Sequence, residues 1–314
     1  MGCLANQTVL PTISFSEQNL EVGSSSWLST SKDVVAALEE FGCFNATYSN
    51  FSPQLHHAIF GASEELFDLP THVKMLNTSD TPTHGYVGQI AAIPLYEGLG
   101  IENATTQDGV TKFTHLLWPS GNETFRETAL EYSKVVAELD KVVMRMVAEV
   151  YGIRSAYESL VETTSYLLKL IKYRPPAKDE AGLGIVPHTD KSFTSILHQR
   201  LVKGLQIMTK AGDWIGVDPS PSAFVFMAGD ACMAFTNGRI EPSKHRVIID
   251  GSEERYSLGL FTFIRDVKIQ VPEELVDEDH PLQFKPFDHY KFIHFIYTEE
   301  SKSSESPIRA FCGV

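Results

Sequence analysis

The chain has 314 residues, of which 43% are hydrophobic and 21% are charged, the balance of an ordinary folded protein. Its formal net charge of -14, from 40 acidic against 26 basic residues, argues against nucleic acid or an anionic membrane surface as a partner. No window reaches the roughly 18 uninterrupted apolar residues of a transmembrane helix.

The first residues, "MGCLANQTVLPTISF", lack the basic start and apolar core of a secretion signal. The four cysteines, Cys3, Cys43, Cys232 and Cys312, show no paired spacing, which is typical of a reducing compartment. We therefore expect a cytoplasmic protein that acts as a monomer.

Helical periodicity dominates the first half of the chain. Residues 29–44 and 52–70 carry apolar side chains at helical spacing, and a loop-like stretch rich in Gly, Pro, Thr and Asn follows Pro70. Residues 124–152 have the longest periodic pattern and predict an amphipathic helix that ends at Gly152. We divide this half into an N-terminal region of helical layer plus loop, residues 1–120, and a long support helix with its connector, residues 121–164.

The second half changes to short apolar or alternating runs. Turn residues separate these runs every 8–12 positions, as in an all-β sandwich or barrel. We assign residues 165–270 to a double-stranded β-helix (jelly roll) core. Residues 275–300 predict a return to helix, so that residues 271–314 form a C-terminal helical lid and tail. The predicted fold is mainly β with α.

The stretch "PHTDKSFTSILHQ", residues 187–199, places a histidine and an aspartate where a buried strand should carry apolar side chains. Residues two apart on a strand point to the same face, so His188 and Asp190 converge while Thr189 points away. An imidazole and a carboxylate on one face supply two thirds of a facial metal site. Two histidines and one carboxylate, with three positions left open, suit a non-haem iron(II).

The third ligand should come from a later strand, and His245 in "SKHRVII" opens such a run. Ten positions further along, "RYS" offers Arg255 and Ser257 on one strand face. A guanidinium fork and a hydroxyl suit the far carboxylate of a metal-chelating dicarboxylate. Each motif alone also has a structural interpretation, such as a strand-end histidine or a surface arginine. The combination of the three favours the metal site.

These motifs resemble those of the plant 2-oxoglutarate and iron(II)-dependent dioxygenases. The resemblance rests on "HTDKSFTSILHQ", "GLQIM", "GDWIGVDP", "NGRIEPSKHRV" and "RYSLGLFTF", and "LPTISFSEQNL" and "VVAALEEFGCF" extend it to the N-terminal region. "FTHLLWP", "HTDKS" and "ELVDEDHPLQFKPF" are most similar to the branch with the glucosinolate side-chain dioxygenases and deoxypodophyllotoxin synthase.

The resemblance implies an enzyme that uses iron(II), 2-oxoglutarate and O2, with ascorbate as the reductant. It assigns His188, Asp190 and His245 to the metal, and Arg255 and Ser257 to the 5-carboxylate of 2-oxoglutarate. The implied reaction oxidises a small plant specialised metabolite and releases succinate and carbon dioxide. Hydroxylation of a C–H bond, O-demethylation, desaturation and oxidative ring closure all belong to this chemistry.

One segment departs from the family's pattern. Many relatives carry Asn-Tyr-Tyr-Pro on the strand that leads into the site, whereas this chain has "KYRP" from Lys172 to Pro175. Strand parity puts Lys172 and Arg174 on one face and Tyr173 on the other. Either the two cations face the pocket and contact substrate or cosubstrate, or the register turns Tyr173 inward as a cosubstrate contact and leaves the cations at the barrel rim.

Apolar side chains near these motifs are candidates for substrate contacts, with core packing as the alternative for each: Phe113, Leu117, Phe261, Phe292 and Phe295. Two rival functions stay open. One is an oxidase of the same fold that does not use 2-oxoglutarate, such as a relative of aminocyclopropane-carboxylate oxidase. The other is a non-catalytic jelly-roll binding protein. Succinate formation tests the first rival, and iron(II) titration without oxygen tests the second.

Overall fold

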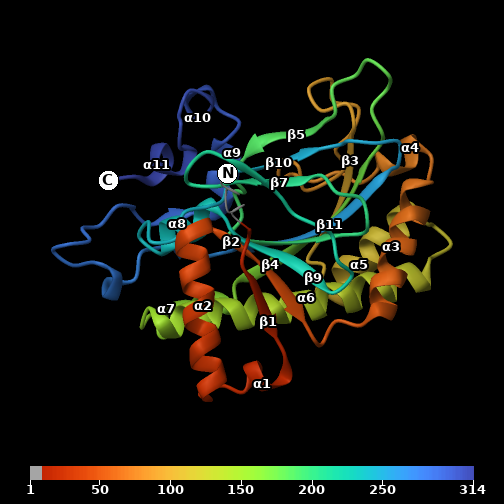
Figure 1. Cartoon of the computed structure of the whole chain (residues 1–314). Coiled ribbons are helices and arrows are strands. Elements are labelled where there is room, and N and C mark those ends of the chain that lie inside the picture. Colours follow the sequence, from red (N-terminus) through yellow and green to blue (C-terminus); the bar gives the residue numbers. More distant parts are fainter. Residues whose placement is uncertain (1–8) are drawn as a thin grey trace, which may run out of the picture.

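A pair of β-sheets forms the core of the computed structural model, which describes residues 9–314 (Figure 1). The larger sheet has seven strands in the order β1-β2-β9-β6-β11-β4-β3, and the smaller has four in the order β5-β10-β7-β8. The strands of the larger sheet are β1 (Thr12–Phe15), β2 (Cys43–Tyr48), β3 (Tyr96–Glu102), β4 (Thr164–Tyr173), β6 (Thr194–Gln199), β9 (Ala223–Ala228) and β11 (Arg255–Ile264). Those of the smaller sheet are β5 (Leu183–His188), β7 (Leu205–Met208), β8 (Trp214–Gly216) and β10 (His245–Ile248).

An apolar cluster joins the two sheets. Val225 and Met227 of β9 belong to it, together with Leu205 and Ile207 of β7 and Val247 of β10. The central strands of the larger sheet are also covered on their other face, by helices. Strands that are buried on both faces have nearly continuous apolar sequences. This is why the sequence predicts strands at β9 and β11.

Helices cover the outer face of the larger sheet. The long helix α6 lies against β4, β6 and β11, and α2 and α3 pack on α6 (Figure 1). The side chain of Asn122 accepts a hydrogen bond from the backbone N–H of Phe125 and so caps the start of α6. The helices of this layer and its connectors are α1 (Glu17–Leu20), α2 (Ser25–Phe41), α3 (Pro53–Phe67), α4 (Thr71–Lys74), α5 (Gln107–Leu117), α6 (Glu123–Val150) and α7 (Arg154–Val161).

The C-terminal segment differs from the single helix predicted over residues 275–300. Pro281 and Pro286 interrupt that stretch, because proline has no N–H to donate within a helix. The observed elements beyond the sheets are α8 (Asp230–Phe235), β12 (Lys268–Ile269), the 3-10 helix η1 (Glu273–Leu275), β13 (Phe287–Asp288), α9 (His289–Phe295), α10 (Glu299–Lys302) and α11 (Pro307–Cys312).

The N-terminal region is also more than a helical layer, since β1, β2 and β3 extend the larger sheet at both of its edges. No helix within residues 9–314 is long and apolar enough to cross a membrane. Cys43, Cys232 and Cys312 are buried free thiols, and Cys3 lies outside the described residues.

A buried carboxylate ties α6 to the sheet that carries part of the site. Asp140 of α6 accepts hydrogen bonds from the hydroxyls of Thr194 on β6 and Tyr166 on β4. Thr194 also contacts the hydroxyl of Thr262 on β11, at 2.6 Å. Burial raises the pKa of Asp140 to about 6, and the two donated hydrogen bonds only partly oppose this rise.

Stability should therefore depend on the charge of Asp140. Its pKa is higher in the folded than in the unfolded chain, so folding takes up a proton between about pH 4 and pH 6 and stability falls as pH rises. Relative to Asp140→Asn, the wild-type free energy of unfolding should drop by about 1 kcal/mol from pH 5 to pH 8 in urea titrations. Glu138→Gln, on an exposed face of α6, is the matched control. A pH-independent difference between wild type and Asp140→Asn would contradict this account.

Candidate active site

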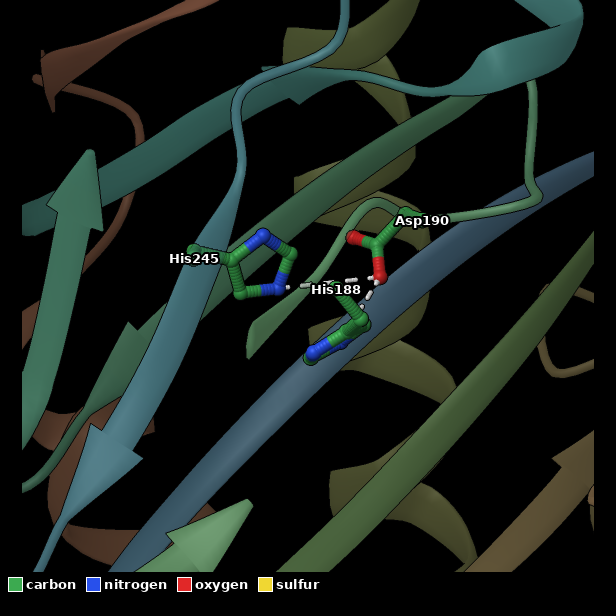
Figure 2. A group of neighbouring side chains, drawn as sticks. All are labelled: His188, Asp190 and His245. Atoms are coloured by element: carbon green, nitrogen blue, oxygen red, sulfur yellow. Dashed lines mark ion pairs between the residues drawn. The ribbon is translucent and has the colours of Figure 1, made fainter. Parts of the chain in front are cut away.

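Two histidines and an aspartate converge where β5 and β10 lie side by side. His188 ends β5 and is paired with His245, the first residue of β10, while Asp190 follows β5 by two positions. Figure 2 shows the three side chains pointing toward one another. The Oδ1 of Asp190 lies 3.6 Å from the Nε2 of His188 and 3.7 Å from the Nε2 of His245. One ligand atom from each residue lies within 4.8 Å of the others.

Backbone carbonyls fix the orientation of both imidazoles. The Nδ1 of His188 lies 2.8 Å from the carbonyl oxygen of Val186, and the Nδ1 of His245 lies 3.2 Å from that of Ser243. A carbonyl oxygen only accepts, so each Nδ1 carries the proton and each Nε2 presents a lone pair to the centre. Metal-binding histidines are held in this way by their second nitrogen.

The charge state of the three residues suits a divalent cation. Burial alone would raise the pKa of Asp190, but the attraction of His245 and His188 outweighs burial and holds this pKa below its usual range. Burial lowers the pKa of His245 to about 4, and the nearby His188 adds to the effect. The Oδ2 of Asp190 is buried without a hydrogen-bond partner among the described residues. Two imidazoles and an incompletely satisfied carboxylate fit iron(II) in a facial triad.

A buried arginine lies in the same cavity, whose volume is about 300 Å³. Arg255 is 2% exposed and donates to the Oγ of Ser257 at 3.2 Å and to the Oε1 of Gln199 at 2.8 Å. Its Nε has no hydrogen-bond partner within residues 9–314, and its Cζ lies 5.1 Å from the centre of the Tyr173 ring. Burial raises the pKa of Tyr173 to about 12, so this ring is neutral and does not balance the guanidinium charge.

No carboxylate within residues 9–314 pairs with Arg255. A fully buried cation with only neutral partners is costly, and an anion that enters the cavity would relieve this cost. The residues present therefore fit both a metal ion and, beside it, a small carboxylate that is bound by a guanidinium fork.

Comparison with known proteins points to the same chemistry. Residues 164–264 match the model of the 2OG-Fe(II) oxygenase superfamily, and residues 10–108 match that of the N-terminal region of the non-haem dioxygenases in morphine synthesis. The chain is 43% identical to the probable 2-oxoglutarate-dependent dioxygenase AOP1 of Arabidopsis thaliana. The alignment spans 312 residues and covers 97% of this chain and 96% of the relative. This chain belongs to the 2-oxoglutarate and iron(II)-dependent oxygenases.

Solved structures support the fold of this oxygenase. The rice dioxygenase for auxin oxidation is 27% identical, with a TM-score of 0.82 over 98% of this chain and 100% of that one. The dioxygenase for auxin oxidation 1 of Arabidopsis thaliana, in its complex with 2-oxoglutarate, is 28% identical to this chain. Its TM-score is 0.78, and the superposition covers 87% of this chain and 100% of that one. The predicted jelly-roll fold, family and plant branch are confirmed, and the oxygenase uses iron(II), 2-oxoglutarate and O2.

The strand β4 decides between the two interpretations of "KYRP". It turns Tyr173 into the cavity, together with Lys169 and Ile171. Lys172 lies outside it, where its Nζ pairs with Glu254 at 2.6 Å, and Arg174 forms a bidentate pair with Glu180. The assignment of Lys172 and Arg174 to the substrate pocket is therefore corrected, because the register leaves both cations on the rim.

Removing these rim cations should leave the kinetics of the oxygenase nearly unchanged. Both ion pairs lie outside the cavity, with the Lys172 side chain partly exposed and that of Arg174 exposed. Pairs near the surface contribute about 0–1 kcal/mol, so Lys172→Met and Arg174→Met should each change the KM for 2-oxoglutarate by less than about fivefold. The measurement is the 2-oxoglutarate dependence of succinate formation. A larger rise in KM for either variant would contradict this prediction and indicate that the replaced cation contacts 2-oxoglutarate.

Of the apolar candidates, Phe261 of β11 lines the cavity. Phe113 and Leu117 do not, because α5 buries them against α6, where the Phe113 ring stacks on Phe125 with 5.7 Å between centroids. Their predicted role as substrate contacts is corrected, and core packing is the observed role.

The C-terminal helix α9 reaches the cavity through other residues than those predicted. Phe292 is fully buried and packs on Phe311, and Phe295 packs on the same ring, with 5.1 Å between centroids. Ile293 and Ile296 line the cavity instead. The predicted substrate contacts of α9 are thus wrong by one position each. Phe292 and Phe295 anchor α9 to α11 instead of lining the cavity.

The polar cavity residues that sequence reasoning missed include Gln199, Lys169 and His84. Gln199 lies opposite Ser257 in the β6–β11 register, so strand pairing was needed to find it. Lys169 gave a usable signal, because a lysine inside the apolar run "SYLLKLIKY" must either reach solvent or line a polar site. His84 lies in the irregular loop before β3 and gave no signal.

Proposed function

We propose that this oxygenase binds iron(II) through His188, Asp190 and His245 and oxidises a small plant specialised metabolite. The observation that carries the proposal is the facial set of two Nε2 atoms and one carboxylate oxygen, placed in one cavity with a buried arginine that lacks an anionic partner. The described histidines outside this set, such as the exposed His280, have no comparable arrangement.

Arg255 and Ser257 are proposed to hold the 5-carboxylate of 2-oxoglutarate. The guanidinium is already aligned by Gln199, and the Ser257 hydroxyl lies beside it on the same strand face. Tyr173 covers the guanidinium from β4, its partner strand. This arrangement offers a charge-assisted fork in a dry environment, where it binds a carboxylate more strongly than in water.

The apolar walls of the cavity are proposed to receive the substrate and exclude water. When bound, iron(II) supplies the O2-dependent oxidation that hydroxylates C–H bonds, with demethylation, desaturation and ring closure as variants, while 2-oxoglutarate is converted to succinate and carbon dioxide. Phe261, Ile293 and Ile296 lie on the cavity wall and position the substrate. The protein's part in this chemistry is to orient substrate and cosubstrate and to keep the site dry.

The names of similar proteins support a small-molecule substrate. Relatives in Arabidopsis thaliana are called 2-oxoglutarate-dependent dioxygenases, and the rice structure is described as a dioxygenase for auxin oxidation. For this chain we propose a small metabolite, cytoplasmic location and a monomeric enzyme. The charge of -14 agrees with the absence of nucleic acid among its partners.

The decisive experiment incubates the protein with iron(II), ascorbate, 2-oxoglutarate and a plant metabolite extract, and measures succinate and new products by mass spectrometry. Succinate formation that depends on iron(II) and is stimulated by extract is expected. A new product without succinate would favour the same-fold oxidase that does not use 2-oxoglutarate. The non-catalytic binding protein would yield neither succinate nor product.

A further inference from the structure

A buried lysine lies in the cavity, away from Arg255. Lys169 is 6% exposed, lines the cavity from the middle of β4, and has no carboxylate partner within residues 9–314. Its Nζ donates to the carbonyl oxygens of Thr83, at 2.6 Å, and Gly85, at 3.1 Å. Burial lowers the pKa of Lys169 to about 7. Two carbonyls leave one of the three N–H groups of the ammonium for another acceptor.

A histidine with an open nitrogen comes from the same loop. His84 is 3% exposed, lines the cavity and packs on Phe263, with 4.7 Å between ring centroids. Its Nδ1 lies 3.1 Å from the Oε1 of Glu102, whereas its Nε2 is buried without a partner among the described residues. A buried polar atom without a partner calls for a ligand or a water molecule.

A glycine on the neighbouring strand β3 makes room for this polar site. Lys169 is paired with Gly100 on β3 and with Gly259 on β11. A Cβ on Gly100 would come within 1.7 Å of the His84 carbonyl oxygen, so only glycine lets the loop pack here. The loop is thereby brought against β3, next to the Lys169 ammonium.

The polar site and the cosubstrate arginine lie at different ends of the cavity wall. Tyr173, which is paired with Arg255, is four residues from Lys169 on β4, a separation of about 13 Å along a strand. Ile171, which is paired with Ser257, lies between these ends, and Phe261, which is paired with Leu167, lies on the other side of Lys169. A molecule that reaches Lys169 can therefore rest on apolar side chains while 2-oxoglutarate occupies the Arg255 end.

We propose that Lys169 binds an oxyanionic group of the substrate, so that this oxygenase acts on small apolar acids. The inference rests on the proposed function, because it assumes that Arg255 is taken by 2-oxoglutarate. The Lys169 ammonium balances the charge of the acid through the N–H that its two carbonyl partners leave free. The apolar body of the acid rests on the apolar wall beside Lys169, to which Ile171 and Phe261 belong.

The test compares acids with their own neutral partners. Wild-type protein loaded anaerobically with iron(II) and 2-oxoglutarate is titrated by calorimetry with phenylacetate, indole-3-acetate, indole-3-butyrate and naphthalene sulfonate. The neutral partner of each carboxylate is its methyl ester, and that of the sulfonate is naphthalene sulfonamide. At least one acid should bind about tenfold or more tightly than its neutral partner, equivalent to about 1.4 kcal/mol. This comparison needs no variant. The sulfonate arm distinguishes a carboxylate preference from a general oxyanion preference.

Variants then assign the preference to Lys169. Lys169→Met should lose the acid preference, and Lys169→Arg should restore part of it. Lys74→Met is the matched control, because Lys74 is another buried lysine that donates to a backbone carbonyl, that of Phe67 at 2.8 Å, but lies outside the cavity. The control should keep the wild-type preference.

The proposal is overturned if no acid is preferred over its neutral partner, whether both bind equally or neither binds, or if Lys169→Met keeps the preference. Failure of the proposed function gives a different result. In that case the wild type would show no 2-oxoglutarate binding and no succinate formation, whereas failure of this inference alone leaves both intact.

Discussion

Replacing Asp190 with alanine should reduce iron(II) affinity and succinate formation by more than about 100-fold. Loss of an outer partner of a metal ligand alone typically costs about 10–100-fold, and Asp190 is the one anionic ligand of the proposed set. Its Oδ1 lies 3.6 Å and 3.7 Å from the two imidazole Nε2 atoms, so its removal leaves the metal cation without a negatively charged ligand. The measurements are anaerobic iron(II) titration and 2-oxoglutarate turnover.

His280→Ala is the control for this experiment. His280 also pairs with an aspartate, Asp277, at 2.9 Å, but the pair lies on the surface. The control should bind iron(II) as the wild type does. His188→Ala and His245→Ala should behave like Asp190→Ala, with thermal unfolding little changed. Full turnover by any of these three variants would remove that residue from the metal site.

The metal triad was predictable because its elements carry local signals. His188 and Asp190 share a strand-end motif, and His245 opens another short strand of the same sheet. The parity rule also placed Arg255 and Ser257 on one face correctly, since β11 is a regular strand with unbroken pairing to β4. What the sequence alone could not supply was the distance between the strands.

The face of β4 that points into the cavity could not be predicted. The alternation of side chains along a strand allows either Tyr173 or the pair Lys172 and Arg174 to face inward, and only the pairing with the neighbouring strand selects one of these. Tyr173 faces inward because it is paired with Arg255, whose side chain needs the cavity. The same limit explains the lid. The apolar residues of α9 point both toward the cavity and toward α11, and the packing of Phe311 decides which ones are anchors.

The fold of the terminal regions was harder to predict than the core. The edge strand β3, with the sequence "YEGLGIE", contains two glycines, which disfavour strands on propensity grounds. In the structure these glycines adjoin the cavity wall, and Gly100 admits the loop that carries His84. The glycines weaken the sequence signal for a strand, but they make space for the site. Functional sites are where the local secondary-structure preference of a residue is expected to disagree with its place in the fold.

The second large effect is expected for Arg255→Gln, which should raise the KM for 2-oxoglutarate about thirty-fold or more. Truncating one partner of a buried charge pair costs about 2–5 kcal/mol, and each 1.4 kcal/mol is a factor of ten. Arg255 has no other anionic partner within the described residues, so this penalty falls on the cosubstrate. Iron(II) binding should persist, because the metal ligands lie on β5, directly after it and on β10, rather than on β11.

Arg174→Gln is the matched control, since Arg174 also forms a bidentate pair but with Glu180 on the surface. Surface pairs contribute little, so its KM for 2-oxoglutarate should stay within about fivefold of the wild type. Calorimetry with 2-oxoglutarate under anaerobic conditions separates binding from turnover. If Arg255→Gln kept the wild-type affinity, Lys169 would be the remaining buried cation of the cavity available to hold the cosubstrate. The assignments of the two ends of the cavity would then be exchanged.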